Sequence, residues 1–128
     1  MKTLRKFLLA ATLGPAILAA APVVSMAADL YGSIAYSQQT RNYAWSIDYN
    51  TQYEAENSAM NECYKRAGDC KSALWFVNGC GALAVGDDGG WGSNWGHNFR
   101  EAQNKAISQC NGVSYNCQVV ITKCVTGY

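Results

Sequence analysis

Only a few residues of this 128-residue chain have the type and spacing that acid–base chemistry needs. Its single histidine, His97, lies in the stretch WGSNWGHNF, and Asp87 and Asp88 stand upstream of it in GDDGG. A histidine works as a general base when a carboxylate orients it and a nucleophile lies within hydrogen-bond reach. One interpretation is therefore a small secreted hydrolase that uses His97 with Asp87 or Asp88. His97 also directly precedes a predicted helix cap, which explains it without catalysis, so we do not predict an enzyme.

The other carboxylates have structural explanations. Glu54 and Glu101 each follow a cap residue, Thr51 and Asn98, at the spacing of a capping box. The two aspartates of GDDGG lack the fuller ligand spacing of a calcium loop, and they would repel a phosphate held by a glycine-rich loop. The sequence therefore predicts no metal and no cofactor.

Aromatic residues gather in two segments rich in Asn, Ser, Gly and Tyr. Tyr43 and Trp45 precede the first predicted helix, and Trp91, Trp95 and His97 lead into the second. Exposed rings in such loops would offer a flat surface to a sugar or to a protein, whereas buried rings would complete a thin core. We predict that these five residues bind a protein partner or a wall glycan, with the two segments at related places in the two halves.

The six cysteines predict a disulfide framework, because their count is even and their spacing is too wide for a zinc site. The segments CYKRAGDC and CNGVSYNC repeat one spacing 47 residues apart, each across a turn that follows a helix-like run. The natural pairs are Cys63–Cys70 and Cys110–Cys117, which leaves Cys80–Cys124 to join the two halves. The alternative by symmetry is Cys63–Cys110 with Cys70–Cys117, and six cysteines allow fifteen connectivities.

The first residues have the composition of an export signal. Three basic residues precede the apolar run FLLAATLGPAILAAAPVV, and SMA then supplies the small residues that a signal peptidase reads. Cleavage after residue 27 predicts a periplasmic or secreted protein with no remaining membrane span, in which residues 28–128 form a single domain. That domain keeps 7 basic and 9 acidic residues, a net charge of −2, so it has no electrostatic surface for nucleic acid.

An internal repeat organises the predicted domain into halves at about 30–79 and 80–126. An offset of 47 residues aligns Ala55 with Ala102 and Ala59 with Ala106, along with the cap glutamates and two cysteines. Each half offers a β-prone stretch, an aromatic segment that is a strand or a turn, a capped helix and a second β-prone stretch. The predicted strands are 31–37 and 70–78 in the first half and 81–86 and 117–124 in the second.

These elements predict an α+β domain built from two strand-strand-helix-strand units and stabilised by three disulfides. We expect one mainly antiparallel sheet with both helices on one face. In the strand at 70–78, Trp75 is expected in the core, and Glu56 is expected on the polar side of the first helix.

The stretches YGSIAYS and CKSALWFVNGCGALAVG, together with a second helix ending in C-x6-C, resemble a bacterial family catalogued as domain of unknown function 4189. The resemblance covers about residues 30–125, and its most specific part runs from Phe76 to Ala84. It implies an exported, disulfide-bonded bacterial domain and supplies no catalytic residues. With the aromatic segments, it predicts an interaction module of the bacterial envelope; a protein that blocks an incoming toxin or hydrolase is one form of this.

Overall fold

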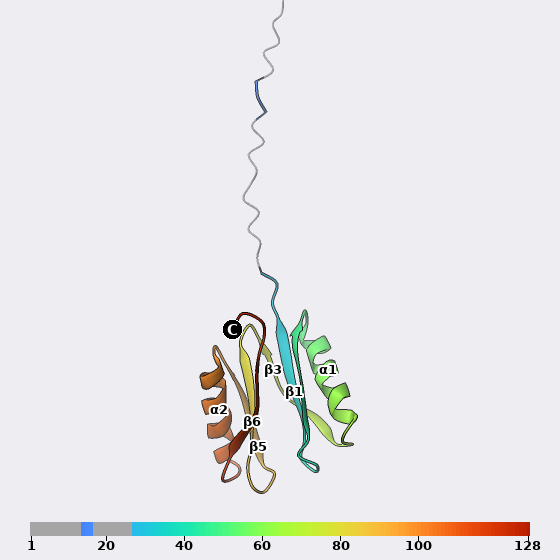
Figure 1. The fold of residues 1–128 in the computed structure, drawn as a ribbon, viewed down its shortest axis with the longest axis vertical. Coiled ribbons are helices and arrows are strands. Elements are labelled where there is room, and N and C mark those ends of the chain that lie inside the picture. Colours follow the sequence, from blue (N-terminus) through green and yellow to red (C-terminus); the bar gives the residue numbers. More distant parts are fainter. Residues whose placement is uncertain (1–13, 17–26) are drawn as a thin grey trace, which may run out of the picture.

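The computed structural model describes residues 14–16 and 27–128, so the predicted signal peptide lies almost entirely outside the described residues. From residue 31 onward the chain follows the order β-β-α-β twice, which confirms the predicted duplicated units (Figure 1). The first unit contains β1 (Tyr31–Ser37), β2 (Tyr43–Tyr49), α1 (Gln52–Tyr64) and β3 (Cys70–Val77). The second contains β4 (Cys80–Val85), β5 (Trp91–Gly96), α2 (Phe99–Asn111) and β6 (Gln118–Cys124).

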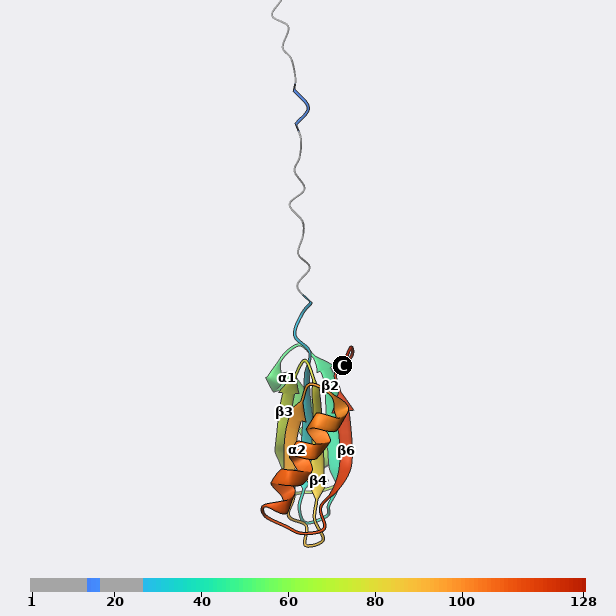
Figure 2. The same cartoon turned by 90° about the vertical axis from the view of Figure 1, so that its left-hand side faces the viewer.

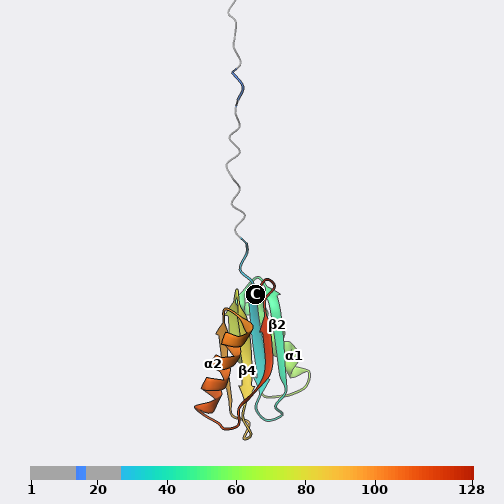
Figure 3. The same ribbon diagram turned by 60° about the vertical axis from the view of Figure 1, so that its left-hand side comes forward.

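Each unit forms its own antiparallel sheet of three strands, in the orders β2-β1-β3 and β5-β4-β6. The α+β class is confirmed, but the expected single sheet with both helices on one face is wrong. The two sheets lie face to face, α1 covers the outer face of the first and α2 covers the outer face of the second (Figures 1 and 2). A third view again places α1 and α2 on opposite sides of the strands (Figure 3).

The central strands explain this layering because they are apolar on both faces. Alternate residues of a strand point to opposite sides. In β1, Ile34 and Tyr36 join Leu83 of β4 in the layer between the sheets, while Ala35 packs under α1. Ala82 and Ala84 in β4 pack under α2 in the same way. Large side chains therefore fill the middle of the molecule, and small ones allow each helix to approach its own sheet closely.

Both helices begin at the predicted caps. The Thr51 side chain accepts a hydrogen bond from the main-chain N–H of Glu54 at 3.2 Å, and Asn98 accepts one from Glu101 at 2.9 Å. Such bonds satisfy main-chain donors that a helix leaves free at its first turn. The buried residues of the two helices also correspond: they are Ala55, Ala59 and Cys63 in α1, and Ala102, Ala106 and Cys110 in α2.

The three predicted disulfides are confirmed as Cys63–Cys70, Cys110–Cys117 and Cys80–Cys124. The role expected for the third is wrong. Cys80 and Cys124 lie directly opposite each other on β4 and β6, so this bond connects two strands of one sheet. The corresponding pair in the first sheet is Tyr31 opposite Val77. No disulfide connects the two halves. They are held together by the apolar layer between the sheets and by hydrogen bonds, such as those from Thr126 to Asp48.

A methyl group at Gly92 is expected to destabilise the fold, because β5 lies against α2 at this position. A Cβ there would meet the main-chain nitrogen of Cys110 and lie 2.8 Å from the carbonyl oxygen of Ala106. Overpacking of this kind costs about 1–3 kcal/mol, so Gly92→Ala should lower the melting temperature by at least several degrees. The control is Gly68→Ala, where a Cβ meets nothing within 4 Å. Equal melting temperatures for the two variants would contradict the close approach of β5 and α2.

Candidate binding groove

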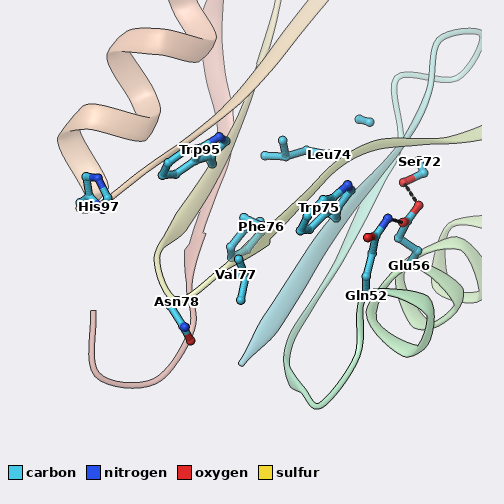
Figure 4. A pocket seen from close by; sticks show the side chains of 11 residues that line it. Gln52, Glu56, Ser72, Leu74, Trp75, Phe76, Val77, Asn78, Trp95 and His97 are labelled. Carbon is cyan, nitrogen blue, oxygen red and sulfur yellow. Dashed lines mark hydrogen bonds between the residues drawn. The ribbon is translucent and has the colours of Figure 1, made fainter. Parts of the chain in front are cut away.

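A groove of about 860 Å³ runs along the open side of the molecule, where β3 and β5 form neighbouring edges of the two sheets. We call it the Trp75–Trp95 groove, after the two indoles that line it (Figure 4). Leu74, Phe76 and Val77 of β3 line its apolar part. The remaining lining residues are Gln52, Glu56, Ser72, Ala73, Asn78 and His97.

The two indoles are half-exposed and come from different sheets. Trp75 is 42% exposed and packs on Tyr31, with ring centroids 6.3 Å apart. Trp95 is 43% exposed, meets the ring of His97 edge-on at 5.4 Å, and has Lys105 Nζ 5.0 Å from its ring centroid. In Figure 4, Trp95 and His97 lie on one side of the groove, and Trp75 lies on the other beside Gln52 and Glu56.

The backbone of β3 borders the groove with an unpaired edge. This strand pairs with β1 alone, and β5 pairs with β4 alone. Within residues 27–128, no backbone hydrogen bond connects β3 with β5. The hydroxyl of Ser93 donates to the carbonyl oxygen of Ala73 at 2.6 Å and links the two strands near the middle of β3. The edge from Leu74 to Val77 has no such link.

Glu56 provides a fixed carboxylate at one end of the groove. Gln52 Nε2 donates to its Oε1 at 2.6 Å, and Ser72 Oγ donates to its Oε2 at 2.7 Å, as the dashed lines in Figure 4 mark. These donors come from α1 and from β3, so the carboxylate is oriented by two elements. Across residues 27–128 the ion pairs are Lys65–Glu62 and Lys105–Glu101, and neither involves Glu56.

The structure divides the predicted binding residues among three places. Trp95 and His97 lie in the groove. Trp91 instead packs against Tyr36 between the sheets, with ring centroids 5.8 Å apart. Tyr43 and Trp45 belong to β2, at the opposite edge of the first sheet. The two aromatic segments thus occupy corresponding edge strands of the two sheets, β2 and β5, and only the second contributes to this groove.

Both aromatic segments are strands, which is one of the two forms expected for them. In β5, Gly92 and Gly96 pack against α2, where a Cβ would meet helix atoms. Strand alternation then turns Trp91 and Trp95 toward the other sheet. Trp91 lies over the inner layer, whereas Trp95 lies at the opening, which explains their different exposure. A role for Trp91 in binding stays a prediction.

The dyad of His97 with Asp87 or Asp88, which the alternative interpretation needs, is not formed. The aspartates precede β5 and His97 follows it, so six extended residues place them about 20 Å apart. Asp87 accepts a hydrogen bond from Asn116 at 2.8 Å. The hydrogen bond from Ser114 Oγ, with a second from the N–H of Gly90, holds the pKa of the Asp88 carboxyl below its ordinary value.

The main chain of His97 takes part in the start of α2. Its N–H donates to Glu101 Oε2 at 3.2 Å. The hydrogen bond from Lys105 Nζ and the one from this N–H hold the pKa of the Glu101 carboxyl below its ordinary value. This arrangement agrees with the capping explanation of the residue.

Sequence reasoning missed Trp75 and Glu56 as groove residues. The expectation that Trp75 lies in the core is wrong, because its neighbour Phe76 occupies the inner face of β3 and leaves Trp75 on the outer face. The internal repeat does not distinguish the two rings. At the offset of 47 residues both align with polar residues, Trp75 with Thr122 and Phe76 with Lys123.

The chain is thus defined as a duplicated α+β domain with three internal disulfides and an open groove between two sheet edges. It belongs to the family described as domain of unknown function (DUF4189), whose sequence profile matches residues 31–124. In the described ranges no helix is long and apolar enough to cross a membrane. The same ranges contain no cluster of three or more His, Cys, Asp or Glu residues that could hold a metal ion.

Mycobacterial proteins are among the relatives of this chain. Protein Mb1300c of Mycobacterium bovis and Protein Rv1269c of Mycobacterium tuberculosis are each 44% identical to it over 63 residues. That match covers 48% of this chain and 46% of each relative, so it spans about half of their length. No solved structure matches the chain significantly.

Proposed function

We propose that this protein is an exported binding module of the bacterial envelope and that the Trp75–Trp95 groove is its ligand site. The observation that carries the proposal is the pair of half-exposed indoles on the two sides of one groove of about 860 Å³. Concave sites lined by aromatic and apolar groups with a few fixed polar groups are typical ligand sites. Glu56 supplies such a polar group here.

The three disulfides support a periplasmic or secreted location, because disulfides persist in oxidising compartments. The arrangement around His97 supports binding over hydrolysis. Within residues 27–128 its ring forms no hydrogen bond to a carboxylate or a hydroxyl, which a general base in a dyad would need. The ligand is then a partner protein or a wall glycan, and a protective role against a toxin or hydrolase is one use of such binding.

Co-sedimentation with isolated envelopes of the producing bacterium tests the proposal. The purified protein should bind, and the double variant Trp75→Ala/Trp95→Ala should bind at least about thirtyfold more weakly, because a buried aromatic anchor contributes 2 kcal/mol or more. Trp45→Ala is the matched control, since this indole is 39% exposed but lies at the other edge of the sheet. Unchanged binding of the double variant would show that the groove is not the site.

Two pretreatments of the envelopes identify the class of ligand. Loss of binding after protease treatment indicates a protein, and loss after muramidase treatment indicates a glycan. Both indoles that the double variant removes are half-exposed in the wild type. Its melting temperature should therefore stay close to that of the wild type, and this measurement distinguishes a loss of binding from a loss of folding.

A further inference from the structure

The two halves of the molecule provide an internal comparison for the groove. Gln103 of α2 aligns with Glu56 of α1 at the repeat offset, and Thr122 aligns with Trp75. In the second half, Gln103 Nε2 donates to Thr122 Oγ1 at 3.0 Å and connects the helix with its edge strand. In the second half, a neutral hydrogen bond therefore connects the helix with the edge strand, and neither a carboxylate nor an indole takes part. The connection between a helix and its edge strand can therefore be made without the charge of Glu56 and without the ring of Trp75.

A comparison of the exposed tryptophans points in the same direction. Trp45 has Lys123 Nζ 4.0 Å from its ring centroid, and Trp95 has Lys105 Nζ at 5.0 Å. A cation over an indole face is an attractive contact. Among residues 27–128, Trp75 is the exposed tryptophan with no Lys or Arg over its ring. It shares the groove with Glu56, whose carboxylate has no ion-pair partner in the same range.

The free edge of β3 indicates what kind of backbone a ligand should have. An extended peptide that joins the free edge of a sheet forms main-chain hydrogen bonds and sends alternate side chains to opposite faces. Natural edge strands are usually protected by charges or bulges. Here the bulge and the Ser93 hydrogen bond at Ala73 protect only the first half of β3, and the stretch from Leu74 to Val77 carries no charge.

We infer that the groove binds an extended peptide segment that pairs with the edge of β3 and places a Lys or Arg side chain against Glu56 and Trp75. The inference rests on the proposed function and names the chemistry of its ligand. Strand alternation sends the neighbouring side chains of the peptide toward Leu74, Phe76 and Trp95, so those residues should be apolar (Figure 4). The recognised sequence is thus a basic residue flanked by apolar ones.

Selection from a phage-displayed library of random dodecapeptides tests this pattern. The enriched peptides should carry a Lys or Arg between apolar residues, and one of them is then synthesised and titrated against purified variants. Glu56→Gln should weaken its affinity about fivefold, as the loss of a partly exposed ion pair does. Adding Trp75→Thr should bring the total to about tenfold or more. This double variant gives the first half the Gln and Thr of the second half, so it should remain folded.

Two further titrations separate strand pairing and ligand class. Two versions of the peptide carry N-methyl groups, one on the odd-numbered amides and one on the even-numbered amides. One version should lose binding, because only one set of amides faces β3. If both versions bind as tightly as the unmethylated peptide, strand pairing is overturned. Enriched peptides without a basic residue, or no effect of Glu56→Gln, would overturn the recognition of a cation.

Chitotetraose serves as the glycan probe. Suppose that chitotetraose binds, that Trp95→Ala abolishes this binding, and that the library yields no enriched peptide. The inference is then wrong, while the proposed function stands. If neither chitotetraose nor any peptide binds in a way that depends on Trp75 or Trp95, both are wrong.

Discussion

Replacement of Phe76 by alanine is expected to lower the free energy of unfolding by about 3–5 kcal/mol, as the truncation of a packed aromatic residue does. The Phe76 side chain is 2% exposed and lies between the two sheets. A Cβ on Gly32 of β1 would come within 2.6 Å of its Cε2 atom, and one on Gly81 of β4 within 2.5 Å of its Cε1 atom. One ring therefore fills the space above two central strands, and its loss leaves a cavity where the halves meet.

Urea denaturation followed by circular dichroism measures this effect. The neighbouring variant Trp75→Ala is the control, because the side chain next along β3 is half-exposed and should cost less than about 1 kcal/mol. A loss of stability in Trp75→Ala as large as that in Phe76→Ala would contradict the assignment of the two faces of β3.

Removal of the Cys80–Cys124 bond by the double variant Cys80→Ala/Cys124→Ala is expected to cost about 4 kcal/mol. The bond closes a loop with a sequence separation of 44, and the loop-entropy relation gives this value for the lost restriction of the unfolded chain. The same relation gives about 2.5 kcal/mol for each local bond, whose separation is 7. Since single domains are stable by only about 5–15 kcal/mol, loss of the long bond removes a large share.

The double variant Cys63→Ala/Cys70→Ala is the matched comparison in the same denaturation experiment. Its midpoint should lie between those of the wild type and the Cys80→Ala/Cys124→Ala variant. The reverse order would show that the local bond contributes more than its loop length explains, for example by holding α1 against β3.

The elements of this fold are predictable because their signals are local and occur twice. The Thr51 and Asn98 caps need only the residue three positions later, and each local disulfide needs only a turn between its cysteines. The packing of one sheet on the other depends on contacts such as Leu83 with Ile34, which no local pattern specifies. The single sheet was therefore a reasonable expectation and a wrong one.

The candidate site was predicted in part, for a related reason. Alternation along a strand says that Trp75 and Phe76 point to opposite faces, but it does not say which of them faces inward. The inner position depends on Gly32 and Gly81, two glycines on other strands that make room for a ring. Trp95 could be identified because it is an aromatic residue in a polar segment. Glu56 could not, because its contact with Ser72 joins α1 to β3 and no local pattern predicts it.

The covalent connection between the two face-to-face units has an evolutionary consequence. As separate identical chains they would pack as a symmetric homodimer, and any substitution at one opening between the sheets would appear at the other as well. Gene duplication followed by fusion removes that restriction. In this chain Lys123 of β6 lies over the ring of Trp45 in β2, at one pair of sheet edges. The counterpart of Lys123 in the repeat is Phe76 of β3, which is buried between the sheets near the other pair of edges. The two pairs of sheet edges can therefore differ, and in this chain one has Lys123 over Trp45 while the other forms the Trp75–Trp95 groove.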